Sequence, residues 1–158
     1  LFRLPGYCAS LKSGKVKGTA RPIASEIAPG AVRVSGDGGF APLALEVGLP
    51  VLAMKAKSQG IAGMGLVDIY HFAALWPEVE TLAEQGLCAF AFTQASPMVA
   101  PAGGIKPFFG TNPMAFSWPR PGKDPYVFDQ ASAAMARGDV MIHARDGMAI
   151  QQRIRQRS

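Results

Sequence analysis

Four residues, at three places in this sequence, carry side chains that could do chemistry. His71 lies between an apolar run and a predicted helix, where backbone N–H groups and the helix dipole favour a phosphate. Asp129 directly follows an apolar strand, and open α/β sheets place ligand contacts at such strand ends. Thr111 and Asn112 lie in a loop rich in Pro and Gly, from which they could aim a hydroxyl and an amide at a ligand. Taken singly, none of these positions decides a function.

Each position also has a purely structural explanation. His71 could be a helix cap or a packed residue, and Asp129 could cap the segment that follows it. The loop around Thr111 could be an ordinary surface loop with turn chemistry. Asp139 and His143 are four residues apart and would share a helical face, for which a surface pair is the simplest account.

The elements that must position these residues alternate between helical and strand-like patterns. The apolar spacing predicts helices over residues 4–11, 41–58 and 72–85 and near 138, with Leu43, Val47, Val51 and Met54 as the stripe of the second. Strands are predicted at 32–34, 61–67, 87–93, 114–118 and 126–128, an extended connection at 19–30 and a turn at 36–39. This order indicates an α/β fold with a largely covered sheet.

The glycine pattern excludes the common nucleotide-binding fingerprints. The cluster at residues 60–65 has reversed spacing relative to G-x-G-x-x-G, and it lies between a helix and a strand instead of after a strand. No P-loop occurs. Any nucleotide must therefore be held in another way.

The composition is that of a globular protein. Of 158 residues, 49% are hydrophobic and 17% are charged, a balance that allows one domain with a sizeable core. No run of about 18 apolar residues occurs, and no secretory leader pattern begins the chain. We therefore expect a cytoplasmic protein without a membrane partner. Cys8 and Cys88 lack metal-ligand spacing, so we expect two buried thiols and no metal.

The positive charge does not indicate a nucleic-acid partner. The net charge is +5, but three arginines stand in the last six residues and the other basic residues are scattered, with a loose group at 12–17. A duplex-binding domain would show a denser basic stripe. A mildly basic enzyme with a phosphorylated cofactor and an anionic substrate explains the charge equally well.

Both ends of the chain look cut. It begins at Leu1 without an initiator Met, and residues 151–158 have no apolar periodicity. We expect residues 1–150 to be part of one domain, incomplete at both ends, followed by a frayed or foreign tail at 151–158.

Several separated motifs, read in order, resemble the malate/L-lactate dehydrogenase family. They are residues 1–7, His71-Phe72-Ala73-Ala74-Leu75-Trp76-Pro77-Glu78, residues 101–104, Phe109-Gly110-Thr111-Asn112-Pro113, residues 127–132 and residues 136–139. The segment at 71–78, with residues 117–121, is most similar to the Δ1-piperideine-2-carboxylate/Δ1-pyrroline-2-carboxylate reductases of that family. The likeness covers residues 1 to about 150.

The resemblance implies a non-Rossmann dinucleotide fold and a homodimer that moves hydride between NADPH, or NADH, and C2 of a small 2-imino or 2-oxo acid. Arg3 would clamp the substrate carboxylate with its planar guanidinium, and Asp139 would orient the catalytic histidine. The other substrate contacts would be Thr111, Ser132 and Ala133. The cofactor would be lined by His71, Phe72, Ala73, Ala74, Leu75, Asp129, Gln130 and Ala131. Arg3, Thr111 and Asp129 should therefore converge on one cleft.

Three departures from the family pattern bear on activity. The family has Ser-His-Gly immediately before the Leu-x-Arg segment, and its His donates a proton, but nothing precedes Leu1 here. The usual Thr-Ser is replaced by Ser132-Ala133, which removes one hydroxyl. The family also continues well past Ile150. We therefore expect this polypeptide, as given, to have little or no activity.

Two other functions compete with an imine reductase. One is a related dehydrogenase of 2-hydroxy acids such as malate, lactate or ureidoglycolate. The other, from a different class, is a non-catalytic binding module that contacts nucleic acid through residues 12–17 and the terminal arginines.

Overall fold

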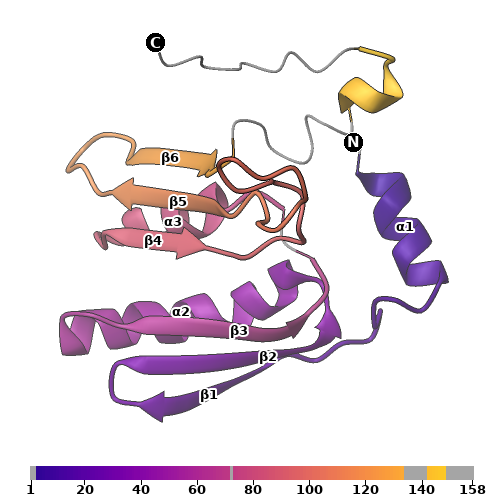
Figure 1. Cartoon of the computed structure of the whole chain (residues 1–158). Coiled ribbons are helices and arrows are strands. Elements are labelled where there is room, and N and C mark those ends of the chain that lie inside the picture. The colour runs from indigo at the N-terminus through magenta and orange to yellow at the C-terminus, as the bar shows by residue number, and fades with distance from the viewer. Residues whose placement is uncertain (1–2, 72, 134–141, 149–158) are drawn as a thin grey trace, which may run out of the picture.

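The computed structural model describes residues 3–71, 73–133 and 142–148, and these form two three-stranded sheets with helices between and beside them (Figure 1). Phe72, Asp139 and the expected tail at 151–158 lie outside the described residues. The first sheet holds β1 (Ile23–Ala28), β2 (Ala31–Gly39) and β3 (Gly63–Ile69), and the second holds β4 (Ala89–Phe92), β5 (Pro113–Trp118) and β6 (Tyr126–Ala131).

The first sheet mixes the two strand orientations. β1 pairs with β2 antiparallel, and β2 pairs with β3 parallel through the crossover helix α2 (Ala41–Gln59). The turn predicted at 36–39 was wrong, since β2 continues to Gly39, which pairs with Ile69. A Cβ at Gly36 would collide with the Ile69 side chain, so glycine permits this strand contact. The prediction of a plain connection at 19–30 was also wrong, because it contains β1.

Small residues form the face by which α2 packs on the first sheet. Its buried residues are Ala41, Ala44, Gly48, Ala53 and Lys55, of which Ala44 and Gly48 contact the first sheet and Ala53 packs toward α3 and the second sheet. Of the predicted stripe, Val51 packs against the core of the first sheet, whereas Leu43, Val47 and Met54 are 42%, 37% and 58% exposed. A Cβ at Gly48 would lie 2.7 Å from Val34 Cγ2 and would clash with Met64. The helix therefore approaches the strands too closely for large side chains on that face.

Lys55 shows how a buried charge is accommodated in this interface. Its ammonium donates to Glu26 Oε2 at 2.7 Å and to the carbonyl oxygens of Ala28 and Pro29 at 3.3 and 3.0 Å. A buried ammonium requires such partners. Lys55 therefore joins the end of α2 to the β1–β2 connection.

The second sheet is antiparallel and is covered on one face by α3 (Trp76–Ala83). Ala115 and Ser117 point toward the helix and are fully buried, and Ser117 Oγ donates to the Val79 carbonyl at 2.6 Å. The opposite face carries the cross-strand row Phe90, Phe116 and Phe128, and Phe90 is 63% exposed. The expectation of largely covered sheets was therefore wrong, because each sheet has one open face among the described residues.

Two hydrophobic clusters hold the layers together. One lies between α2 and the first sheet around Val32, Val34 and Ala44. The other joins α2, α3 and the second sheet around Ala53, Leu75 and Val79. Because α2 contributes to both clusters, it connects the two sheets.

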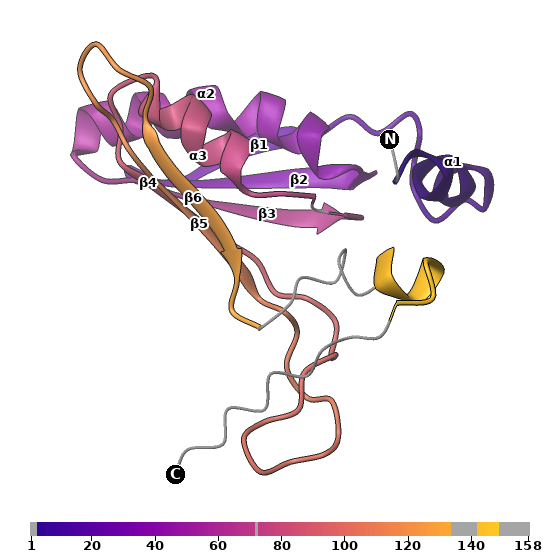
Figure 2. The same ribbon diagram turned by 90° about the horizontal axis from the view of Figure 1, so that it is seen from above.

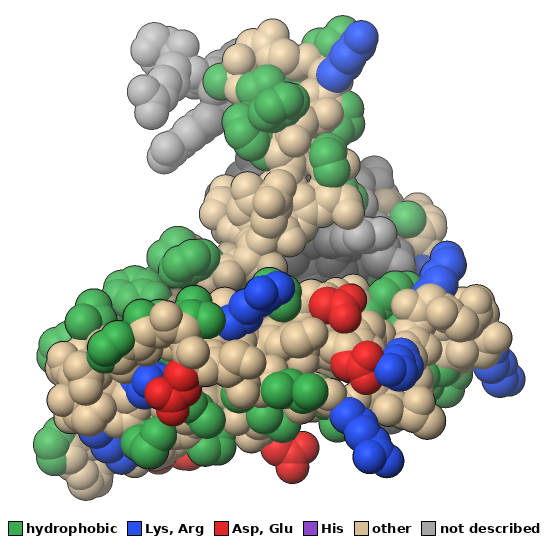
Figure 3. Space-filling model, turned by 90° about the horizontal axis from the view of Figure 1, so that it is seen from below, with side chains coloured by type: hydrophobic (Ala, Val, Ile, Leu, Met, Phe, Trp, Pro, Cys, Tyr) green, Lys and Arg blue, Asp and Glu red, His purple; other side chains and the backbone are tan. Residues whose placement is uncertain are grey.

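The connection between β4 and β5 projects from the body (Figure 2). Figure 3 shows hydrophobic side chains gathered on this loop, where Ile105 is 94% and Phe108 is 70% exposed. Within the described part of the chain, none of the helices combines the length and apolar character that a bilayer crossing requires.

The two thiols are exposed, so the prediction that they are buried was wrong. Cys8 lies on α1 (Leu4–Lys12), a helix that buries no residue. Cys88 follows α3 and lines an open hollow beside β4.

Candidate functional site

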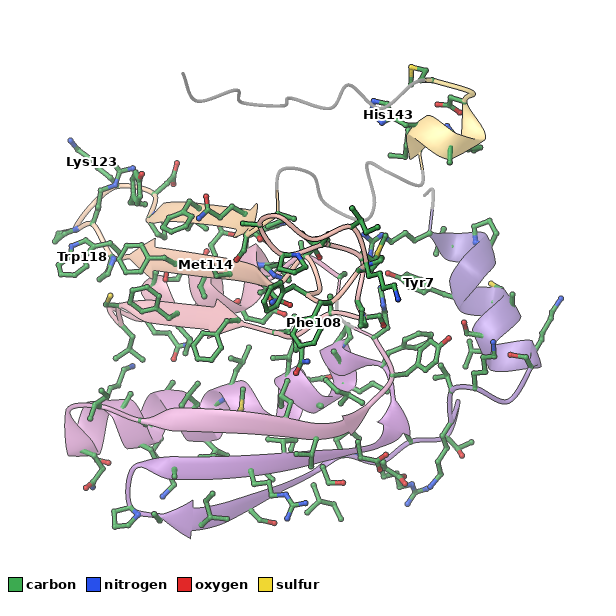
Figure 4. All side chains as sticks on the ribbon, viewed as in Figure 1. Tyr7, Phe108, Met114, Trp118, Lys123 and His143 are labelled. Atoms are coloured by element: carbon green, nitrogen blue, oxygen red, sulfur yellow. The ribbon has the colours of Figure 1, made fainter. Side chains whose placement is uncertain are left out.

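A cavity of about 610 Å³ lies where the carboxyl ends of β3, β4 and β6 meet the start of β5. Eight of the residues proposed from the sequence line it: Arg3, His71, Ala73, Ala74, Thr111, Asp129, Gln130 and Ala131. Arg3, Thr111 and Asp129 thus border one space, although they come from three distant parts of the chain. Trp118 lies at the opposite end of the second sheet (Figure 4).

Arg3 reaches the cavity because aromatic contacts dock α1 on the body. The Tyr7 ring lies edge-on to Phe40 at 5.2 Å and tilted to His71 at 5.5 Å, and Tyr7 is labelled in Figure 4. Ser10 Oγ and Tyr70 Oη are 3.1 Å apart. Since α1 buries no residue, these contacts set the position of Arg3, the N-cap residue of this helix.

Arg3 and His71 contact each other directly. Arg3 Nη1 donates to His71 Nε2 at 3.1 Å. A guanidinium has no acceptor, so this bond requires an unprotonated Nε2 and places the histidine proton on Nδ1. The residue proposed for the substrate thus touches the segment proposed for the cofactor.

Asp129 caps α3 from the end of β6. Its Oδ2 accepts from the backbone N–H groups of Leu75 at 2.7 Å and Trp76 at 3.0 Å. The competing explanation was a cap of the segment that follows Asp129, but the helix that this carboxylate caps comes earlier in the chain. The expectation that His71 lies at a helix N-terminus open to a phosphate was also wrong: α3 begins at Trp76, and its first N–H groups are bonded to Asp129.

The remaining sequence-predicted residues lie next to the cavity without lining it. Leu75 is 1% exposed and packs in the core, while its N–H bonds to Asp129. Ser132 N donates to the Thr111 carbonyl at 2.9 Å, and Ala133 N donates to the same oxygen at 3.4 Å. These two residues therefore contact the backbone of Thr111 and do not border the space themselves. Phe72 and Asp139 lie outside the described residues, which leaves the Asp139–His143 spacing undescribed.

The sequence reasoning missed several residues that line the cavity. Tyr70 follows β3, and Gln94, Ala95 and Ser96 follow β4. The argument that singled out Asp129, a polar residue just past a strand end, would have selected Gln94 and Ser96 as well.

A model of the malate/L-lactate dehydrogenase family matches residues 1–155. The chain belongs to this family. The predicted membership and α/β class are thereby confirmed, and a crystal structure of Δ1-piperideine-2-carboxylate reductase from Pseudomonas syringae pvar. tomato has a TM-score of 0.90 at 46% identity. That match covers 96% of this chain and 46% of the other.

Family members with named activities differ in their degree of likeness to this chain. The Δ1-pyrroline-2-carboxylate/Δ1-piperideine-2-carboxylate reductase of Pseudomonas aeruginosa is 53% identical over 150 residues, which are 95% of this chain and 45% of that protein. Malate dehydrogenase from Entamoeba histolytica is more distant, with a TM-score of 0.84 at 26% identity over 92% of this chain and 40% of that one. The chain spans less than half the length of these relatives.

A second hollow of about 730 Å³ is lined by residues of α2 and β3 on one side and of α3 and β4 on the other, and most of these residues are apolar. Glu78 lines it and is 8% exposed, with Oε2 lacking a hydrogen-bond partner. Burial raises the pKa of Glu78 above its ordinary value of 4.5, the backbone N–H of Glu78 opposes this, and the charge of Asp129 adds to the rise. Helix α3 therefore buries a carboxyl whose Oε2 has no hydrogen-bond partner among the described residues.

We expect Asp129→Ala to lower the free energy of unfolding by about 1–2 kcal/mol, because two N–H groups at the start of α3 lose their acceptor. Asp129→Asn keeps an acceptor oxygen and should cost less. Urea unfolding followed by circular dichroism measures both. Asp124→Ala, in the exposed β5–β6 turn, is the control and should change stability by less than about 0.5 kcal/mol. Equal losses for the Asp129 and Asp124 alanine variants would contradict the capping role.

Glu78→Gln should remove one source of pH-dependent stability. A carboxyl whose pKa is raised by folding stabilises the fold fully below its ordinary value of 4.5, and this stabilisation is lost as the pH rises through the raised folded pKa. Relative to the unmodified chain, Glu78→Gln should therefore become more stable as the pH rises above 4.5. Urea unfolding at a series of pH values below and above 4.5 tests this, with the exposed Glu46→Gln as control. A constant difference between the variant and the unmodified chain would refute it.

Proposed function

We propose that this sequence belongs to an enzyme that reduces a cyclic 2-imino acid, Δ1-piperideine-2-carboxylate or Δ1-pyrroline-2-carboxylate, with a reduced nicotinamide cofactor. The observation that carries the proposal is that one cavity is bordered by Arg3, Thr111, residues 129–131 and three residues before α3, namely His71, Ala73 and Ala74. The 53% identity to a reductase named for both imines supports the substrate class.

The cavity lining fits a nicotinamide cofactor. Its volume of about 610 Å³ falls within the usual range for cofactor sites, about 300–1,000 Å³. Ala73, Ala74 and Ala131 leave room for flat rings, and Gln94 and Gln130 offer amides to hydroxyl or phosphate groups. When bound, the cofactor supplies the hydride that becomes bonded to C2. We propose NADPH in this role, with NADH as the alternative.

The substrate would be held by a guanidinium and a hydroxyl. Arg3 would bind the carboxylate through two parallel N–H donors. Thr111, which is 8% exposed at the cavity wall, would contact the same small molecule. Reduction of the imine also needs one proton on the ring nitrogen, for which the family resemblance implies a histidine oriented by Asp139. We further propose a cytoplasmic homodimer for the full-length enzyme, as the resemblance implies.

A dehydrogenase of open-chain 2-hydroxy acids is the second candidate. It is supported by the likeness to malate dehydrogenase from Entamoeba histolytica, at 26% identity. The greater identity to the imine reductases favours the cyclic substrate, and a comparison of cyclic with open-chain ligands separates the two.

Ligand binding to the ¹⁵N-labelled chain tests the site. NADPH should shift the amide resonances of Ala73, Ala74 and Ala131, while pyrrole-2-carboxylate, a planar and stable analogue of the imine, should shift those around Thr111 and bind more tightly than malate. Arg3→Lys keeps the charge but loses the planar fork, so pyrrole-2-carboxylate should bind about tenfold more weakly. The exposed Arg33→Lys on β2 is the matched control. Shifts centred on Trp118, or no binding of either ligand, would refute the proposal.

Residues 1–158 alone should turn over Δ1-piperideine-2-carboxylate at least about 100-fold more slowly than the Pseudomonas aeruginosa reductase. Their only histidines are His71 and His143, and loss of a general acid costs about 10²–10⁴ in rate. The decrease of NADPH absorbance measures the rate. Turnover comparable with that of the longer enzyme would show that residues 1–158 hold every group that the reaction needs.

A further inference from the structure

Three segments that line the cavity meet behind it at Asn112. Its side-chain Oδ1 accepts from Ala95 N at 3.3 Å, and its carbonyl accepts from Ser132 Oγ at 2.6 Å and Ser132 N at 3.3 Å. Ala95 lies in the segment after β4, and Ser132 directly follows β6. Asn112 is not among the residues that border the space. The sequence suggested that Asn112 could aim its amide at a ligand, but the amide contacts the protein backbone.

The backbone conformation of this residue is itself unusual. Asn112 has a φ of +40°, in the left-handed region that Asn and Asp occupy more readily than other non-glycine residues. Pro113 further restricts the backbone of Asn112, because a proline disfavours the α region for the residue that precedes it. Such a conformation persists where the surrounding contacts hold it.

Glycine at position 110 is required by the same contact. A Cβ there would collide with the backbone of Ala95 and would lie 2.7 Å from Asn112 Oδ1. The amide of Asn112 and the backbone of Ala95 thus close over Gly110 and leave no space for a side chain. Thr111 lies between these two residues, and its carbonyl accepts from Ser132 N at 2.9 Å.

We propose that Asn112 is a positioning residue for the reduction, an inference that rests on the proposed function. Its amide oxygen holds the segment after β4 against the loop before β5, and its carbonyl holds the end of β6. Thr111 is carried on this junction, so its hydroxyl and the neighbouring Ser96 keep a fixed separation at the part of the cavity proposed for the substrate. His71, Ala73 and Ala74, which are proposed to line the cofactor, precede the start of α3 that Asp129 holds, and the side-chain hydrogen bond of Asn112 to Ala95 does not involve them.

Three substitutions separate the hydrogen bond from the backbone strain. Asn112→Gly accepts the positive φ but lacks the amide, Asn112→Asp accepts it and keeps an acceptor oxygen, and Asn112→Ala lacks the amide and adds strain. Asn112→Gly should bind pyrrole-2-carboxylate about tenfold more weakly, as expected for loss of one hydrogen bond that orders the site, while NADPH affinity changes less than about threefold. Asn112→Asp should bind both ligands nearly as the unmodified chain does.

Amide hydrogen exchange gives a readout that needs no ligand. Exchange at Ala95 should accelerate in Asn112→Gly and recover in Asn112→Asp, while amides within α2 stay protected. The control is Asp68→Gly, which relieves a positive φ of 53° elsewhere in the chain and should alter neither affinity.

The outcomes distinguish this inference from the proposed function. If the unmodified chain binds both ligands and Asn112→Gly binds each as tightly as the unmodified chain does, the positioning role is wrong and the proposed function stands. The same conclusion follows if Asn112→Gly loses affinity for both ligands to the same degree. If Asn112→Asp is as impaired as Asn112→Gly, the acceptor oxygen is not what matters and the role is likewise wrong. If the unmodified chain binds neither ligand, the proposed function and this inference both fall.

Discussion

The bond between the Asp129 carboxylate and the first N–H groups of α3 is the contact on which the cavity depends. It fixes the start of α3 against the end of β6, and residues 73–74 and 129–131 on either side of it line the same space. The helix N-terminus also stabilises the negative charge of the Asp129 carboxylate. Without this bond, that charge would face anionic ligands in the cavity. Arg3 remains as the basic group at the wall, in contact with His71.

Small residues set how closely the layers approach. Gly48 and the alanines of α2 allow that helix to lie directly on β2 and β3, and Gly110 allows the loop before β5 to lie against Ala95. Large side chains at these positions would push the strand ends apart. The cavity lies between these closely packed layers, and its lining offers polar groups that include Arg3, Thr111, Gln94 and Gln130.

Local patterns in the sequence predicted α2 and β5 almost to the residue, because helix stops such as Gly60 and period-two alternation act within a few residues. They failed where distant contacts decide. α3 was predicted to begin at Phe72 but begins at Trp76, since its cap is a carboxylate more than fifty residues later in the chain. β1 was missed because its residues are almost all exposed and show no buried alternation.

The sequence by itself determined the family, the α/β class and half of the residues that line the cavity, because motif identity and strand-end position are local properties. Only the tertiary structure decided what those residues contact. It turned Asp129 toward a helix N-terminus, joined Arg3 to His71, and directed Asn112 to the backbone of Ala95. The direction of a side chain depends on which segments lie beside it, and that proximity is created by packing between residues far apart in the chain.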